Sequence, residues 1–244
     1  MEISVIPSAL QGSIKAIPSK SAAHRLLICA ALADSETEIS CPILSKDILA
    51  TAHCLQAMGA KITHDEGCFV VKPIEQPIEN AELDCGESGS SLRFLLPVVC
   101  ALGISAKIKM AGRLPQRPLS PLWEELERHG AELSRPEKNI IQTAGKLRAG
   151  EYRIRGDISS QFISGLLFAL PLLKGESRII IDGDMESEGY VHMTLNALES
   201  FSVRWRFEEN VFSLSENSPF ISPCRSAVEG DWSNGAFWLV ADAI

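Results

Sequence analysis

The chain has 244 residues, of which 45% are hydrophobic and 22% are charged, and its mean hydropathy is +0.08. These values are typical of a globular domain and exclude a disordered, collagen-like or coiled-coil protein, and no apolar run reaches the roughly 18–20 residues that a membrane span needs. A formal net charge of -8 and a pI near 5.2 argue against a general binder of nucleic acid or of anionic membranes.

The N-terminus has neither the basic segment nor the apolar core of a signal peptide, so we expect a cytoplasmic protein. The 7 cysteines are odd in number, contain no C-x-x-C pair, and some of them, such as Cys29 and Cys100, lie inside apolar runs. They are interpreted as buried reduced thiols rather than as a disulfide framework. The histidines and cysteines between His53 and Cys68 fit no common zinc module, so neither a metal site nor a cofactor is predicted.

Three hydroxyl-rich segments, here called openers, are each followed by an apolar run of helical period. They are centred on Ser21, Ser90 and Ser160, about 70 residues apart. Each apolar run is followed by a second amphipathic stretch that predicts another helix. These second helices are predicted over 47–62, 121–134 and 191–207.

Short alternating stretches bounded by turn residues predict the strands of each unit. They cover 68–73, 106–112, 139–145, 151–156, 177–183 and 211–216. The sequence therefore predicts a unit that occurs three times and consists of a helix, a strand, a second helix and a closing segment rich in strands. Because no unit of this size can bury a hydrophobic face alone, we expect an α/β fold in which the units pack around inward-facing helices.

A fourth opener stands near the end of the chain. The segment Gly230–Gly235 leads into the apolar run AFWLVADAI, and the sequence stops at Ile244, about three helical turns later. A helix with an exposed apolar stripe needs a partner. We therefore expect the chain to be a fragment, or one half of a larger two-domain protein.

The openers suggest an anion-binding site. A helix start presents free backbone N–H groups and the positive end of the helix dipole, which together bind phosphate or carboxylate. Basic residues accompany the openers. Lys20 and Arg25 belong to the first opener and Arg93 follows the second, while Arg117 lies in a rigid loop ahead of a helix. Three helix starts that converge on one point would form an anion pocket in an otherwise acidic protein.

Each of these features also has a plainer interpretation. A serine at a helix start can be only an N-cap, and Lys20 and Arg25 can be solvated surface charges. The turn Gly86–Gly89 lacks the G-K-[ST] ending of a P-loop, so it gives little support to nucleotide binding. The acidic residues between Asp182 and Glu188 fit a solvated turn better than a metal site.

Several motifs resemble those of the 5-enolpyruvylshikimate-3-phosphate synthase family of enolpyruvyl transferases. The segment 18–25, PSKSAAHR, is similar to the family's G-S-K-S-x-x-x-R signature, and 84–93, DCGESGSSLR, to its G-N-[AS]-G-T-x-x-R segment. Further segments resemble its R-P loop, its D-x-S-S-Q-F stretch and its S-K-P-Y turn; they are 114–118, 156–162 and 184–190. The order and spacing match along the whole chain. The departures are Glu87 for Asn, Ser90 for Thr, and 188–189 for Lys/Arg-Pro.

The resemblance implies an enolpyruvyl transferase-like globe of three βαβαββ repeats around inward-facing helices, an inside-out α/β barrel. In this family two such globes enclose the active site. The globe here would comprise residues 18–227, which would bind the shikimate phosphate. Residues 1–17 and 228–244 would belong to a truncated second globe, so the missing C-terminal globe is an implied partner.

The resemblance also implies roles for individual residues. Contacts to shikimate-3-phosphate are implied for Lys20, Ser21, Arg25, Ser159, Ser160, Gln161, Ser187 and Tyr190. The residues implied to line the phosphoenolpyruvate side are Lys20, Gly89, Arg117 and Gln161. Lys20 is the one implied catalytic residue of this half, as a group that transfers a proton. Asp47 and Arg93 are implied supporting residues.

The implied function of the parent protein is transfer of the enolpyruvyl group of phosphoenolpyruvate to the 5-hydroxyl of shikimate-3-phosphate, with release of phosphate. The family's catalytic carboxylates would lie beyond Ile244, so this chain is expected to bind but not to catalyse. The alternatives are a stand-alone non-catalytic binding domain for a phosphorylated small acid, and a structural repeat protein whose openers are only caps. Neither Lys20 nor Arg25 lies in an apolar run, so replacing either is expected to weaken phosphate binding without unfolding the domain.

Overall fold

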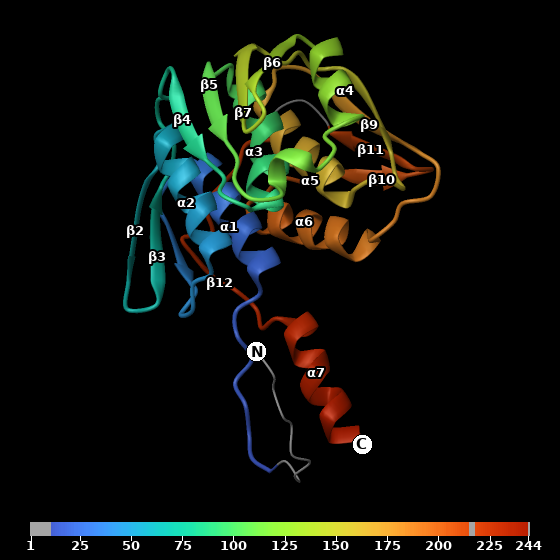
Figure 1. The fold of residues 1–244 in the computed structure, drawn as a ribbon. Helices are drawn as coiled ribbons and strands as arrows, with labels where there is room; N and C mark the ends of the chain where they lie inside the picture. The colour runs from blue at the N-terminus through green and yellow to red at the C-terminus, as the bar shows by residue number, and fades with distance from the viewer. Residues whose placement is uncertain (1–10, 215–217, 244) are drawn as a thin grey trace.

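The computed structural model describes residues 11–214 and 218–243 (Figure 1). Its centre is formed by the helices that follow the three openers. They are α1 (Lys20–Leu32), α3 (Gly89–Leu102) and α5 (Ser160–Ala169), and α5 continues into the short 3-10 helix η2 (Leu170–Leu172). Ser19, Ser88 and Ser159 are their N-caps, and each serine hydroxyl oxygen accepts a backbone N–H of its own helix at 3.2–3.3 Å. The predicted openers are therefore helix starts.

The second helix of each unit is shorter than predicted. The three helices are α2 (Lys46–Met58), α4 (Leu122–Arg128), which follows the 3-10 helix η1 (Leu114–Gln116), and α6 (Glu188–Ser200). The prediction was wrong at their C-terminal ends, where the strands β2 (Lys61–Asp65), β6 (Ala131–Glu137) and β10 (Arg206–Glu208) begin within the predicted ranges. Gly59 and Gly130 take φ angles of 120° and 104°, which end α2 and α4 before their apolar periodicity ends.

Each unit has a four-stranded sheet of the same topology. The second unit has the order β4 (Ala81–Asp84), β5 (Ala106–Lys109), β7 (Ile140–Gly145), β6. The third has the order β8 (Glu151–Arg155), β9 (Ser177–Asp182), β11 (Val211–Leu214), β10. In both sheets the first pair of strands is parallel and the others are antiparallel. The predicted three-fold repeat is confirmed by these matching sheets.

The first unit takes one of its strands from the far end of the chain. Its sheet has the order β12 (Arg225–Ala227), β1 (Thr37–Ser40), β3 (Cys68–Lys72), β2. Strand β12 is parallel to β1, as β4 is to β5 and β8 to β9. The segment before α1 and the segment after β12 cross each other and are joined by two backbone hydrogen bonds. Ser19 N donates to Glu229 O, and Asp231 N donates to Ile17 O, each at 2.8 Å. Strand β12 lies outside the alternating stretches predicted from the sequence, as do β1, β2, β4, β6 and β10.

The central helices α3 and α5 approach each other closely. Both are buried on nearly every side, as the largely apolar sequences after their first turns require. At Gly165 a Cβ atom would collide with the backbone oxygen of Arg93 and lie 3.1 Å from Cγ of Pro97. Glycine at this position therefore allows the two helix backbones to touch. Figure 1 shows the helices enclosed by the three sheets, which is the predicted arrangement.

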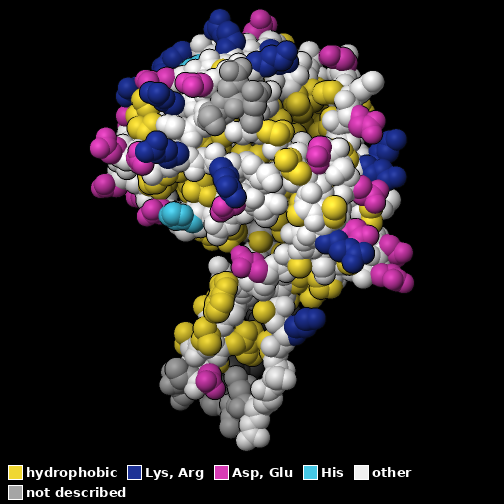
Figure 2. Space-filling view, turned by 180° about the vertical axis from the view of Figure 1, so that it is seen from behind, with side chains coloured by type: hydrophobic (Ala, Val, Ile, Leu, Met, Phe, Trp, Pro, Cys, Tyr) yellow, Lys and Arg dark blue, Asp and Glu magenta, His cyan; other side chains and the backbone are white. Residues whose placement is uncertain are grey.

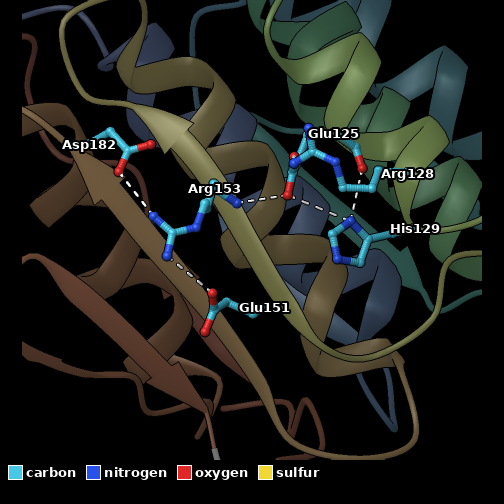
Figure 3. A network of polar contacts seen from close by, with 6 residues as sticks. All are labelled: Glu125, Arg128, His129, Glu151, Arg153 and Asp182. Carbon is cyan, nitrogen blue, oxygen red and sulfur yellow. Dashed lines mark hydrogen bonds and ion pairs between the residues drawn. The ribbon is translucent and has the colours of Figure 1, made fainter.

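A buried carboxylate joins the second unit to the third (Figure 3). Glu125 of α4 is only 3% exposed, and its Oε1 accepts the backbone N–H of Arg153 in β8 at 2.7 Å. His129 follows α4 and stacks on Tyr152 of β8, with ring centroids 3.7 Å apart. Burial raises the pKa of the Tyr152 hydroxyl, which donates to Arg148 O at 2.7 Å. These contacts fix α4 against the third sheet.

Helix α7 (Trp232–Ala243) lies outside the main body, beside the segment that precedes α1. Its apolar side chains are exposed; Phe237 is 77% exposed. Figure 2 shows hydrophobic side chains gathered on this tail. The predicted apolar helix is confirmed. None of the helices in the described part of the chain has the length and apolar character needed to cross a membrane.

Candidate anion-binding site

The starts of α1, α3 and α5 lie at one end of the helical core, together with the start of α6. Gln161 of α5 donates through Nε2 to the hydroxyl of Ser90 in α3 at 3.0 Å. Arg25 of α1 donates to the backbone oxygen of Tyr190 in α6 at 2.8 Å. The second and third openers are therefore in contact, and the first contacts the start of α6. The turn before α6 is in turn joined to the segment before the third opener, where Glu186 N donates to Gly156 O at 3.1 Å.

The second opener places two guanidinium groups close together. The side chain of Arg93 donates to Gln161 Oε1 at 2.8 Å and to Pro118 O at 3.1 Å. Burial, and then the positive charge of Arg117, lower the pKa of Arg93. Gly89 begins α3, and a Cβ there would lie 2.8 Å from a guanidinium nitrogen of Arg117. Two cations beside a helix start form a site that favours an anion.

The first opener carries a solvent-accessible cation. The side chain of Lys20 is 49% exposed, and its Nζ lies 2.8 Å from Asp47 Oδ2. Asp47 belongs to the first turn of α2, so this pair links the first two helices of the unit at the site. The supporting role implied for Asp47 stays a prediction.

Arg25 is a core residue, contrary to the sequence analysis. It is only 2% exposed, and its guanidinium carbon lies 5.0 Å from the ring centroid of Phe94. Its nitrogens donate to Thr194 Oγ1, Ser21 O and Tyr190 O at 2.7, 2.7 and 2.8 Å. Burial lowers the pKa of Arg25 to about 10. The expectation that Arg25 can be replaced without unfolding the domain assumed that Arg25 is not a core residue. That assumption was wrong, because Arg25 lies on the buried side of α1.

The third opener and the start of α6 supply hydroxyl groups. Ser159 caps α5, and Ser160 is buried at the first position of the helix. Ser187 precedes α6 with a φ of 55°, and both Ser187 and Tyr190 are exposed. The tyrosine side chain is therefore accessible while its backbone oxygen is held by Arg25.

Glu87, one of the two departures from the family pattern in the second opener, lies over a neighbouring turn. A Cβ at Gly112 would collide with the Glu87 carboxyl group. Gly112 has a φ of 53°, which favours glycine, and it lies two residues before the 3-10 helix that leads to Arg117. The carboxylate thus packs beside the basic loop.

Buried hydroxyl groups that were not predicted from the sequence hold the helices together beneath the site. Thr194 of α6 lies 2.8 Å from Ser164 of α5, oxygen to oxygen, and also accepts from Arg25. Thr51 of α2 lies 2.6 Å from Ser91 of α3. A signal was present in the sequence: each threonine interrupts the apolar side of a second helix at a similar position.

His24 in α1 is fully buried, and burial lowers its pKa from about 6.5 to about 3. The unfolded chain therefore binds a proton below pH 6.5 that the folded chain does not bind. We expect the free energy of unfolding to fall by about 1.4 kcal/mol per pH unit as the pH falls from 6.5 towards 3. Urea unfolding of the wild type and of His24→Asn over this range checks the result. The same acid slope in both proteins would contradict it.

The comparisons with known proteins agree with these observations. The family described as EPSP synthase (3-phosphoshikimate 1-carboxyvinyltransferase) matches residues 5–244. The relative from Clostridium botulinum (strain Eklund 17B / Type B), named 3-phosphoshikimate 1-carboxyvinyltransferase, is 41% identical over 250 residues, which cover 98% of this chain and 57% of the relative. The relative of the same name from Clostridium beijerinckii is 40% identical over a match that covers 99% of this chain and 58% of the relative.

The solved structure of EPSP synthase from Acinetobacter baumannii is similar in fold. It has a TM-score of 0.79 and 24% sequence identity, over 95% of this chain and 53% of that one. The fold is therefore the enolpyruvyl transferase fold, and the chain spans less than three-fifths of the curated relatives that it matches. With a family match along nearly the whole sequence, and with the family's motifs gathered at one end of its helical core, the chain belongs to the EPSP synthase family.

Proposed function

We propose that this chain is the shikimate-phosphate-binding part of a cytoplasmic enolpyruvyl transferase. The whole protein would transfer the enolpyruvyl group of phosphoenolpyruvate to the 5-hydroxyl of shikimate-3-phosphate and release phosphate. The observation that carries the proposal is the meeting of the three helix starts beside Lys20, Arg93 and Arg117. A phosphate and a carboxylate can each be held by such groups in an acidic protein.

The two ligands are assigned to adjoining parts of the site that share Lys20 and Gln161. The residues proposed for shikimate-3-phosphate are Lys20, Ser21, Arg25, Ser159, Ser160, Gln161, Ser187 and Tyr190. Those proposed for phosphoenolpyruvate are Lys20, Gly89, Arg117 and Gln161. Arg25 supports the site by holding the backbone oxygens of Ser21 and Tyr190, which also orients the first opener towards α6. Lys20 is the candidate for proton transfer because it is exposed and lies beside a carboxylate.

The chain divides, in this proposal, at the crossing between Pro18 and Gly230. Residues 18–227 form the binding globe, whose three sheets have matching topology. Residues 1–17 and 228–244 belong to a second globe. The exposed apolar face of α7 supports this division, because such a face is stable in water only with a partner.

Shikimate-3-phosphate should raise the melting temperature of the chain in a saturable manner. At a ligand concentration of ten times the dissociation constant, the stabilisation of about 1.4 kcal/mol should raise the melting temperature by about 3–6 °C. Lys20→Ala should reduce the rise without changing the melting temperature of the free protein. Lys174→Ala is the matched control, because it removes an exposed lysine after the opposite end of α5. An unchanged melting curve of the wild type at millimolar ligand would contradict the proposal.

The 244-residue chain should show no detectable turnover of the two substrates. Each missing acid, base or charge-stabilising group typically reduces the rate by on the order of 10²–10⁴. The measurement is phosphate release with both substrates present. Turnover that disappears in Lys20→Ala would show that this half is a complete enzyme, whereas binding without turnover is also what a stand-alone binding domain would show. Recovery of activity on adding a separately expressed second globe distinguishes the two.

A further inference from the structure

A row of four buried polar side chains runs from α1 to the start of α3. His24 Nδ1 lies 2.7 Å from Thr51 Oγ1, which lies 2.6 Å from Ser91 Oγ. Ser91 Oγ lies 2.8 Å from Ser88 Oγ. All four residues are buried, and the row ends at the N-cap of α3. It therefore connects the interior of α1, through α2, to the helix start that carries the second opener.

The direction of these hydrogen bonds is set at the far end of the row. The hydroxyl of Ser91 donates to Ser88 Oγ, which also accepts the backbone N–H of Ser91 at 3.2 Å. Ser91 has then used its only hydroxyl hydrogen, so it accepts from Thr51. The hydrogen of Thr51 is used in turn, so Thr51 Oγ1 accepts from the Nδ1–H group of His24.

The second ring nitrogen of His24 supports the same direction. Nε2 is buried and has no hydrogen-bond partner among the described residues. If the row ran the other way, Nδ1 would accept and Nε2 would carry a buried N–H group without an acceptor. Orphaned N–H groups of this kind are rare in folded proteins. With Nδ1 protonated, Nε2 carries no hydrogen and is left with an unpaired acceptor site, which is less costly to bury than an unpaired N–H group.

We propose that His24 is a positioning residue: as its Nδ1–H tautomer, it orients the hydroxyl groups of Thr51, Ser91 and Ser88 and thereby fixes the start of α3. The ring touches no ligand and acts through the row. Its consequence for ligands rests on the proposed function, since Gly89 and Ser90 follow the cap and Gly89 is assigned to phosphoenolpyruvate. Asp47, Lys20 and Arg25 are the charged groups that act on the ring.

The tautomer can be measured directly by long-range ¹H–¹⁵N NMR on the full chain labelled at histidine. We expect His24 to show the neutral Nδ1–H pattern between pH 5 and 8. An Nε2–H pattern would overturn the proposal. Thr51→Val removes the acceptor with little change in shape, so the Nε2–H form should become populated. Thr194→Val is the matched control, because it removes a buried threonine hydroxyl from the Arg25 contacts and should leave the tautomer of His24 unchanged.

Positioning can be separated from a merely structural role by rescue. In His24→Leu the amide hydrogens of Gly89, Ser90 and Ser91 should exchange about tenfold faster than in the wild type, as expected for loss of about one hydrogen bond. His24→Asn should restore the slow exchange, because its amide can donate from the place of Nδ1. Equal exchange in all three proteins would overturn the proposal. If His24→Leu does not fold, the wild-type tautomer decides alone. Neither measurement uses a ligand, so a result that overturns this proposal is distinct from a result that overturns the proposed function.

Discussion

Replacement of Arg25 by alanine should destabilise the chain by about 3 kcal/mol, which lowers its melting temperature by about 6–12 °C. The substitution removes three hydrogen bonds and the contact with the Phe94 ring. The backbone oxygens of Ser21 and Tyr190 then lose a charged donor at a buried position. Urea unfolding followed by circular dichroism measures the loss directly.

Lys20→Ala is the matched control for this prediction. Both residues are cations of the first opener, but Lys20 is half exposed and its ion pair with Asp47 is a surface contact. Exposed pairs contribute about 0–1 kcal/mol, so the variant should unfold close to the wild type. Equal stability of the Arg25 and Lys20 variants would show that the buried guanidinium contacts do not hold α1 to α6.

Gly165→Ala should cost a similar amount, about 3 kcal/mol, for a different reason. The new methyl group would collide with the backbone oxygen of Arg93 and press on Pro97, so α3 and α5 must separate. A backbone atom cannot move away as the end of a side chain can. The same displacement would part Arg93 from Gln161, so the variant should also lose any ligand-induced rise in melting temperature.

Gly189→Ala provides the comparison. Gly189 lies in the first turn of α6, and a Cβ there meets no atom within 4 Å. Alanine should leave stability unchanged or raise it by up to about 0.5–1 kcal/mol, because it favours the helix. If both glycine variants proved equally stable, close contact between α3 and α5 would not be needed for the fold.

The repeat could be predicted from the sequence because its signals are local. Apolar periodicity after Ser21, Ser90 and Ser160 marked the central helices, and alternating stretches marked half of the strands that the structure describes. The C-terminal ends of the second helices were misplaced because apolar spacing continues through Gly59 and Gly130 into the next strand. At each of these glycines the positive φ angle ends the helix, and the hydrophobic pattern carries no information about that angle.

The site could be predicted less completely. The motifs predict Lys20, Gly89 and Arg117 as neighbours of an anion, and the structure places Arg117 beside Gly89. Local pattern did not show that Arg25 faces the core, since an arginine at a helix start usually lies in solvent. Thr51 and Thr194 find their hydroxyl partners on helices from other parts of the chain, so only the packed fold reveals their contacts.

The origin of strand β12 affects how the chain folds as it is synthesised. The second and third units are continuous in sequence, so each can complete its sheet as soon as it has emerged from the ribosome. The first unit cannot, because β1 pairs with residues 225–227. At a synthesis rate of about 5–20 residues per second, the edge of β1 stays unpaired for roughly 10–40 s after Ser40 is made. An open strand edge is a template for pairing with other chains, so the earliest unit to be translated is the last to be protected from aggregation.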